Sequence, residues 1–367
     1  MGKHVYNYYA GGNTAKGFYD LFEETLKRLD RIFILKGGPG TGKSTLMKKI
    51  GESWKSDDNI EYIHCSADYG SIDGVIIPDL KIGIVDGTAP HVIEPKYPGV
   101  IEEYVNLGEA WDSEQLRMYK EPIFQVKNQI KACYDKAYKL FAEALDIHDE
   151  WEKIYIEHLS PEKARQLTNR LKQTIFGDKT LHKKGASLHR FLGSATPEGP
   201  KDFIQNLTDD IPKRLFIKGR PGTGKSTMLK KLAIEGENRG LEVEVYHCGF
   251  DPESLDMLIF RELGVAIFDS TSPHEHFPSR EGDEIVDMYE EVIQSGTDEK
   301  YEEEIKTLSN RYKEKMKQAT AKLKESNHLR NQLESFYIDA VDFSIVEQKQ
   351  AELEQEIVAW KERLMAI

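Results

Sequence analysis

The amino-acid sequence predicts an α/β protein of two tandem units, each with a parallel sheet flanked by helices and each carrying a long helical hairpin as an insertion or extension. Three observations predict this fold. The same motifs occur twice in the same order, short apolar runs alternate with helical segments in both copies, and each copy ends in a long charged segment with few glycines or prolines. We place the two units at residues 1–180 and 181–367.

The internal repeat is the main evidence for a duplicated unit. Each motif of the first copy returns about 182 residues later, with a shift of only one residue along the chain. Three segments recur: ILKGGPGTGKST at 34–45 and FIKGRPGTGKST at 216–227, His64-Cys65 and His247-Cys248, and IVDGTAPH at 84–91 and IFDSTSPH at 267–274. Conserved order and spacing over most of the chain indicate duplication rather than coincidence.

The elements of the first unit follow from the spacing of its apolar residues. A polar lead-in and a short helix are expected over 17–29, followed by a strand over 32–35 and a helix that continues to about Trp54. A second strand ends at His64, and a third covers 82–85. The second unit repeats these strands at Leu215–Ile217, Val243–Tyr246 and Val265–Phe268. Strands that alternate with helices predict a parallel sheet covered on both faces.

Long helical segments close both units, at about 113–176 and 284–366. Apolar residues recur there at steps of three and four among many charges, which is typical of amphipathic helices. The break at 159–161, Leu-Ser-Pro, predicts an antiparallel hairpin in the first arm, and 339–343 is its counterpart in the second. The arms can be solvated lids or packing elements, or alternatively coiled-coil surfaces for a protein partner or for the other unit.

Both units contain the phosphate-binding pattern G-x4-G-K-S. Glycines adopt backbone dihedrals that side chains forbid, so that successive N–H groups can point at one anion. The helix that begins there adds its positive end. The pattern predicts a nucleotide site in each unit. The expected nucleotide-binding residues are Gly37, Gly38, Pro39, Gly40, Thr41, Gly42, Lys43, Ser44 and Thr45, and Gly219, Arg220, Pro221, Gly222, Thr223, Gly224, Lys225, Ser226 and Thr227.

Four side chains of these loops have individual roles. Lys43 and Lys225 are expected to reach the β- and γ-phosphates and to act in catalysis as positive point charges. Ser44 and Ser226 are expected to ligate Mg²⁺ through their hydroxyl groups. A glycine turn with an incidental lysine is the structural alternative, but two matches between a strand and a helix argue against it.

An acidic partner is expected where an apolar strand ends. Asp86 and Asp269 each follow such a run, 43 or 44 residues after the loop lysine. We expect both to hold Mg²⁺ directly or through water. The structural alternative is an aspartate that caps a turn.

With these residues identified, the chain resembles the P-loop NTPase superfamily. The loop text GxPGTGKST is most similar to AAA-type ATPases and is also close to nucleotide kinases. The tandem layout resembles an uncharacterised family of bacterial double P-loop ATPases. The superfamily resemblance implies that ATP and Mg²⁺ bind at the loop, the lysine, the hydroxyl group and the strand-end aspartate of each unit.

The sequence departs from the AAA pattern at one position. AAA-type ATPases place a glutamate after the strand-end aspartate to polarise the attacking water, whereas this chain has Gly87 and Ser270 there. Other polar residues are expected at the same sheet edge, where they could orient water, sense phosphate or accept a proton. These further catalytic candidates are Asp68, Asp251, His91 and His274. Their structural alternative is a hydrogen-bonded role in capping loops.

Two further features have open interpretations. Arg220 replaces Gly38 in the second loop, and it could contact a phosphate, reach the other unit or remain in solvent. The lead-in segments 10–17 and 192–199 could line the pocket for the base or simply cap helices. The His-Cys dipeptides make poor chelating pairs, because adjacent strand residues point to opposite faces. A buried cysteine and a hydrogen-bonded histidine are therefore expected in each unit.

We expect a Mg²⁺-dependent ATP-binding protein, specifically a slow ATPase whose two sites couple hydrolysis to movement of the helical arms. A small-molecule or nucleotide kinase is an alternative, although no arginine after the loop recurs at equivalent places in both units. A second alternative is an ATP-gated binding module with little turnover, which the missing glutamate favours.

Composition and charge limit the classes of partner that we expect for this protein. Lys and Arg number 50 and Asp and Glu 63, giving a net charge of −13, which argues against nucleic acid as a partner. The sequence contains no run of 18 apolar residues, so it predicts no membrane span. Residues 1–10 lack the apolar core of a signal peptide. Three cysteines cannot form a disulfide framework. We expect a cytoplasmic protein with ATP as its ligand and with its two units packed as an intramolecular pseudo-dimer.

Overall fold

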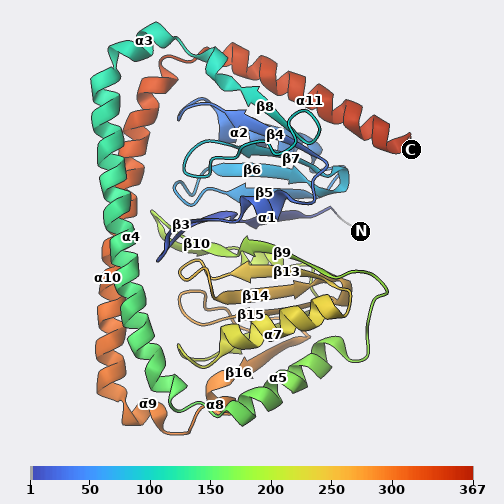
Figure 1. The fold of residues 1–367 in the computed structure, drawn as a ribbon, viewed down its shortest axis with the longest axis vertical. Coiled ribbons are helices and arrows are strands. Elements are labelled where there is room, and N and C mark those ends of the chain that lie inside the picture. Colours follow the sequence, from blue (N-terminus) through green and yellow to red (C-terminus); the bar gives the residue numbers. More distant parts are fainter. Residues whose placement is uncertain (1–2, 367) are drawn as a thin grey trace.

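The computed structural model describes residues 3–366 and contains two six-stranded sheets that meet edge to edge (Figure 1). The first sheet has the order β1-β5-β6-β7-β4-β8 and the second the order β9-β13-β14-β15-β12-β16. The first comprises β1 (Val5–Tyr8), β4 (Arg31–Lys36), β5 (Ile60–His64), β6 (Ile72–Ile77), β7 (Ile82–Asp86) and β8 (Glu102–Asn106). The second comprises β9 (Ala186–Phe191), β12 (Lys213–Lys218), β13 (Glu242–His247), β14 (Leu255–Phe260), β15 (Val265–Asp269) and β16 (Asp283–Asp287).

The α/β class and the predicted strands are confirmed, but the expectation of an all-parallel sheet is wrong. In each sheet one strand, β6 or β14, runs antiparallel to both neighbours, and the other strand pairs are parallel. The cause is the length of the connections. Short turns over 65–71 and 78–81 join β6 to β5 and β7, and a parallel pair would need a longer crossover.

The lead-in segments form two-stranded hairpins, so that the expected helix over 17–29 is too long. In the first half, β2 (Gly11–Thr14) and β3 (Gly17–Asp20) precede a short helix, α1 (Phe22–Leu26). The second half repeats this arrangement with β10 (Gly193–Thr196), β11 (Gly199–Asp202) and α6 (Ile204–Leu207).

The helices that follow the glycine loops lie on one face of each sheet. These are α2 (Lys43–Trp54) and α7 (Lys225–Asn238). A second helix completes the cover of each sheet, and it comes from the opposite half of the chain. α11 (Phe343–Met365) packs its Val346, Leu353 and Ile357 into the core of the first sheet. α5 (Pro161–Phe176) packs Leu167, Leu171 and Ile175 into the core of the second sheet. The two halves therefore exchange one helix each.

The exchange is made by two long helices that run antiparallel along one side of the molecule (Figure 1). They are α4 (Lys120–Ile156), which follows the short α3 (Ser113–Met118), and α10 (Glu302–Ile338), which follows α8 (Met288–Val292) and α9 (Thr297–Lys300). Ion pairs between Glu150 and Arg311, at 3.0 Å, and between Glu143 and Lys315 link the two helices. At their crossing the buried apolar residues are Ala137, Phe141, Ala319 and Leu323.

The expected helical hairpins are therefore wrong, although both predicted breaks are confirmed. α4 ends before Ser160 and α10 ends before residues 339–342, as expected. However, α5 and α11 do not fold back on α4 and α10; they continue onto the opposite sheet. The second arm also starts later than expected, because residues 283–287 form the edge strand β16.

The two sheets meet at the edges formed by β1 and β9. Tyr9 and Phe191 exchange two main-chain hydrogen bonds, of 3.0 and 2.9 Å. On the face opposite α2 and α7, apolar residues of both halves form one continuous core. The Arg190 guanidinium crosses the junction to the carboxylate of Glu61, 2.8 Å away, and this ion pair is buried.

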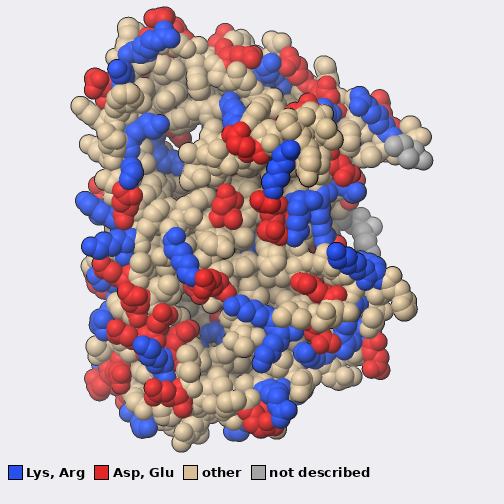
Figure 2. Space-filling model, viewed as in Figure 1, with Lys and Arg blue, Asp and Glu red and all other residues tan. Residues whose placement is uncertain are grey.

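The surface carries charges of both signs. Figure 2 shows acidic and basic side chains interspersed over the face in view, including along the paired helices. Within residues 3–366, no helix has the length and apolar character needed to cross a membrane.

Candidate functional site

The two glycine-rich segments have the same conformation at the ends of equivalent strands. Loop 1 (Gly37–Gly42) connects β4 to α2, and loop 2 (Gly219–Gly224) connects β12 to α7. Gly42 has φ of 82° and Gly224 has φ of 85°, a left-handed conformation that glycine adopts without strain. Among the described residues, no side chain caps the N–H groups that follow these glycines. The positive ends of α2 and α7 therefore have no side-chain partner at the loops.

The predicted lysine and strand-end aspartate come together in both halves. Lys43 Nζ lies 3.5 Å from a carboxylate oxygen of Asp86, and Lys225 Nζ lies 3.2 Å from Asp269. Lys43 Nζ also donates to the main-chain oxygens of Gly37 and Gly38, at 2.7 and 2.8 Å. The ammonium groups thus lie inside the loops, held by protein oxygens.

The predicted metal ligands lie beside these lysines. Ser44 Oγ accepts a hydrogen bond of 3.0 Å from the Ile72 N–H, which fixes the hydroxyl at the start of β6. One Asp86 oxygen accepts hydrogen bonds from the Thr88 N–H and hydroxyl, at 2.9 and 2.6 Å. The other oxygen faces Lys43.

The second half repeats this arrangement. Ser226 Oγ accepts a 3.0 Å hydrogen bond from the Leu255 N–H, and one Asp269 oxygen accepts hydrogen bonds from the Thr271 N–H and hydroxyl, at 3.0 and 2.6 Å. Each half thus offers a hydroxyl and a carboxylate, the hard oxygen ligands that Mg²⁺ prefers.

The other loop residues shape the backbone. The Thr41 hydroxyl donates to the Gly38 oxygen, and the Thr223 hydroxyl donates to the Arg220 oxygen, both at 2.8 Å. Thr45 lies in the first turn of α2 and is exposed, as is its counterpart in α7.

The side chain of Arg220 leaves loop 2 and pairs with residues of α8 and α9. Its guanidinium lies 3.0 Å from the Asp298 carboxylate and over the ring of Tyr289, 5.2 Å from the centroid. Asp298 also accepts a 2.7 Å hydrogen bond from the Tyr155 hydroxyl, so that this group ties the end of α4 to the second half. In this conformation Arg220 fits neither a phosphate contact nor an arginine finger.

Asp68 and Asp251 hold the turns that follow β5 and β13. The Ser71 hydroxyl donates to Asp68 at 2.6 Å, and the Ser254 hydroxyl donates to Asp251 at 2.8 Å. The N–H groups of the same turns occupy the second carboxylate oxygen. These contacts match the structural alternative for the two aspartates.

His91 is a buried cation rather than a base. Its Nε2 lies 3.3 Å from the Asp73 carboxylate, and the ring packs on Phe22 with centroids 4.8 Å apart. Burial opposes the charged form, but the carboxylates of Asp73 and Asp86 dominate and raise the pKa of His91 to about 9. A ring that stays protonated at neutral pH cannot accept a proton from water.

His274 has a different partner from its counterpart. Its Nδ1 lies 3.0 Å from Asp202 at the end of β11, and His276 contacts the other oxygen of this carboxylate at 3.1 Å. Burial again opposes the charge, but the carboxylates of Asp202 and Asp256 raise the pKa of His274. The duplicated histidines are thus held in loop-fixing ion pairs.

The histidines of the His-Cys dipeptides have hydrogen-bond partners within the protein. His64 Nε2 lies 2.8 Å from the Asn7 amide oxygen, and Cys65 is a buried free thiol whose pKa is raised by burial. His247 contacts His189 at 2.8 Å and the Pro252 oxygen at 2.7 Å. In the lead-in hairpins, Asn13 of β2 donates a hydrogen bond to the Ala195 oxygen of β10 and so joins the halves.

Each loop is covered by a helix of the opposite half, a feature that the sequence analysis missed. A Cβ atom built on Gly40 would lie 2.9 Å from the main-chain oxygen of Glu334 on α10. A Cβ atom on Gly222 would collide with the main-chain oxygen of Glu152 on α4. Glu152 and Glu334 are 182 positions apart, the period of the repeat. This period, extended into the arms, is the signal that could have identified them.

No family model matches the chain, and no curated protein or solved structure matches it either. The assignment of a function therefore depends on the chemistry of the two loops.

Proposed function

We propose that the protein binds ATP with Mg²⁺ at loop 1 and at loop 2 and hydrolyses it slowly. One observation carries the proposal: a left-handed glycine starts a helix, the next residue is a lysine, and its ammonium lies within 3.5 Å of a strand-end carboxylate. The arrangement occurs in both halves. Main-chain N–H groups, a positive point charge and hard oxygen ligands together suit a triphosphate and its divalent ion.

In the nucleotide complex, the lysine ammonium groups would bind phosphate oxygens. Lys43 is held by the neutral carbonyl oxygens of Gly37 and Gly38. A phosphate oxygen carries more negative charge, so its hydrogen bond to the ammonium is stronger than a bond to a carbonyl oxygen. Triphosphate binding would therefore draw the ammonium toward the β- and γ-phosphates.

Magnesium fits the oxygen ligands at each loop. When bound, Mg²⁺ would neutralise charge on the β- and γ-phosphates. The serine hydroxyls and aspartate carboxylates would hold it: Ser44 and Asp86 at loop 1, and Ser226 and Asp269 at loop 2. Each serine Oγ accepts one N–H and keeps a lone pair for the ion.

We further propose that turnover moves the long helices. Loop 1 lies against α10 and loop 2 lies against α4, so that a change in either loop acts directly on the helix of the other half. α4 and α10 also pack on each other at the buried cluster around Phe141 and Leu323. The two sites would thus be coupled through one rigid pair of helices.

An ATP-gated binding module with little turnover is the second candidate. Gly87 and Ser270, which follow the strand-end aspartates, supply no carboxylate for the attacking water. This observation favours slow chemistry, and turnover measurements separate the two candidates.

The test measures binding stoichiometry by equilibrium dialysis with ATP and Mg²⁺. We expect two ATP per chain for the wild type, one each for Lys43→Ala and Lys225→Ala, and none for the double variant. Lys313→Ala, a change at an exposed position of α10, is the matched control. Undiminished binding by the double variant would contradict the proposal. Phosphate release without added acceptor supports the ATPase, and binding without release supports the gated module.

A further inference from the structure

Within residues 3–366, the catalytic aspartates and histidines expected from the sequence do not supply the proposed hydrolysis with a free base. Asp68 and Asp251 are occupied by the serine hydroxyls and N–H groups of their own turns. His91 and His274 are paired with the carboxylates of Asp73 and Asp202, which raise the pKa of both rings. A group that activates the attacking water has to come from another element.

The two buried carboxylates below the loops are also engaged. Asp73 pairs with His91, at 3.3 Å. Asp256 lies in the core beside the Cys248 thiol, and burial together with the charge of Asp269 raises its pKa to about 6. Both carboxylates lie below the surface, so that neither offers an open position to the attacking water.

The covering helices each bring one glutamate to the opposite loop. Glu334 lies on the last turns of α10, with its main chain against Gly40. Glu152 lies on the last turns of α4, with its main chain against Gly222. Tyr337, one turn after Glu334, lies against Gly38 and continues the cover of loop 1. The repeat therefore places a glutamate at the same point over both loops.

The Glu334 carboxyl lies among the charged groups of loop 1. It is partly buried, and burial raises its pKa. The positive charges of Arg330 and Lys43 lower the pKa of Glu334, whereas the negative charge of Asp68 raises it. The carboxyl thus senses the charges of Lys43 and Asp68, and the main chain of the same residue lies against Gly40 of loop 1. A raised pKa brings a carboxylate closer to the range suited to accepting a proton.

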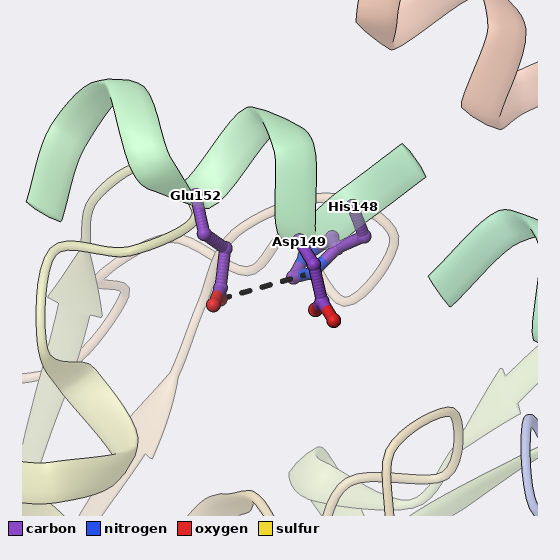
Figure 3. Close-up of side chains that lie close together, drawn as sticks. All are labelled: His148, Asp149 and Glu152. Carbon is purple, nitrogen blue, oxygen red and sulfur yellow. Dashed lines mark ion pairs between the residues drawn. The ribbon is translucent and has the colours of Figure 1, made fainter. Parts of the chain in front are cut away.

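Glu152 has a comparable setting above loop 2. Its carboxylate lies 3.7 Å from His148 Nδ1, one turn earlier on α4, and Figure 3 shows the two side chains directed toward each other. Burial lowers the pKa of His148, and the charge of Lys225 lowers it further. The charge of Glu152 raises it. The His148–Glu152 pair therefore lies within the field of the loop 2 lysine.

A cation site at His148, Asp149 and Glu152 is the competing interpretation of this cluster. The counterpart positions on α10 are Arg330, Asn331 and Glu334. An arginine cannot bind a cation, so that the metal interpretation does not repeat. The glutamate is the member of the cluster that the two halves share.

We propose that Glu334 and Glu152 act as catalytic carboxylates, each at the site of the opposite half. Glu334 acts on ATP at loop 1, and Glu152 acts on ATP at loop 2. This inference depends on the proposed function. It assigns to the helix exchange a chemical role: each site is complete only when the long helix of the other half covers it.

The step balances as a hydrolysis. The oxygen of water forms a bond to the γ-phosphorus while the bond from that phosphorus to the β–γ bridging oxygen breaks. The bridging oxygen keeps the electron pair and leaves on ADP. The glutamate carboxylate accepts the proton of the attacking water and returns it to phosphate or solvent, so that ADP and inorganic phosphate are the products.

The first test compares wild type with Glu152→Gln/Glu334→Gln, which keeps side-chain shape but removes the base. We expect phosphate release to fall at least about 100-fold, while ATP affinity stays within about threefold. Glu121→Gln/Glu314→Gln, at exposed positions of the same helices, is the control and should retain the wild-type rate. Thermal melting midpoints verify that the variants are folded.

The second test assigns each glutamate to its loop. With Lys43→Ala as background, only loop 2 remains, and adding Glu152→Gln should abolish turnover whereas adding Glu334→Gln should not. With Lys225→Ala as background the dependence should reverse. Loss of turnover on removing the glutamate that covers the inactive loop would overturn the crossed assignment.

The outcomes separate the two proposals. Wild type that binds no ATP contradicts the proposed function itself. Wild type that binds ATP at both loops but shows no turnover, or a double glutamine variant that hydrolyses ATP at the wild-type rate, overturns the carboxylate inference alone. Loss of turnover in Asp256→Asn with full activity in Glu152→Gln would also overturn it.

Discussion

The indole of Trp360 donates a hydrogen bond of 3.0 Å to the main-chain oxygen of Leu80, 280 positions earlier in the chain. This contact fixes α11 on the first sheet. The reciprocal contact is made by α5, whose apolar face enters the core of the second sheet. Each half is therefore completed by a helix that the other half encodes.

The exchange predicts that a cavity in α11 weakens the first half rather than the second. Ile357 is fully buried against the first sheet, so Ile357→Ala should lower the free energy of unfolding by about 2–5 kcal/mol. Hydrogen exchange should quicken in β4 and α2. Leu171→Ala in α5 should have the same effect on β12 and α7.

Val358→Ala is the matched control, because Val358 is the exposed neighbour of Ile357 on the same helix. It should change the free energy of unfolding by no more than about 0.5 kcal/mol. Faster exchange confined to the second sheet in Ile357→Ala would contradict the observed packing.

The contact between loop 2 and α4 predicts an unusually costly glycine substitution. Gly222 has φ of 75°, and a Cβ atom there would collide with the Glu152 main chain. Gly222→Ala should combine the left-handed penalty of about 1–2 kcal/mol with the displacement of the helix. Urea unfolding gives the total, and hydrogen exchange should show loosening at the end of α4.

Gly296→Ala separates the two causes. Gly296 has φ of 85° but nothing within 4 Å of the position of its Cβ, so only the backbone penalty applies. Equal losses of stability in Gly222→Ala and Gly296→Ala would show that loop 2 and α4 are not in close contact in solution.

The His91–Asp73 pair predicts a stability contribution that depends on pH. Because the pKa of His91 rises from 6.5 to about 9 on folding, its contribution is complete below pH 6.5 and is lost as pH rises through 9. The full effect is on the order of 3 kcal/mol. Urea unfolding at pH 6, 7.5 and 9 should show the advantage of wild type over His91→Gln shrinking with pH.

His182→Gln, a change at an exposed position, controls for the loss of a histidine as such. An advantage of wild type over His91→Gln that stays constant from pH 6 to pH 9 would contradict a protonated, ion-paired His91.

Local features were predictable from the sequence because they depend on neighbouring residues. The apolar run at 32–35 forms the centre of β4, the helix after loop 1 ends at Trp54, and Lys43 meets Asp86 as their motif spacing implies. The break between α4 and α5 was likewise marked by Ser160 and Pro161.

The sheet pattern and the helix exchange were not predictable in the same way. Residues 72–77 carry a glycine and an aspartate, and a short polar connection rather than a helix sets their antiparallel direction. The apolar stripe of α11 shows that one face is buried but not which sheet buries it. Ile357 would suit either core, and only tertiary contacts decide between them.

A structure with a non-hydrolysable ATP analogue and Mg²⁺ tests most directly whether both glycine loops hold the triphosphate of ATP. We predict a triphosphate in each loop, with the ammonium of Lys43 moved from the Gly37 oxygen to phosphate oxygens and Lys225 moved likewise from Asp269. Two empty loops at saturating analogue, with both lysines still on their protein oxygens, would contradict the proposed function.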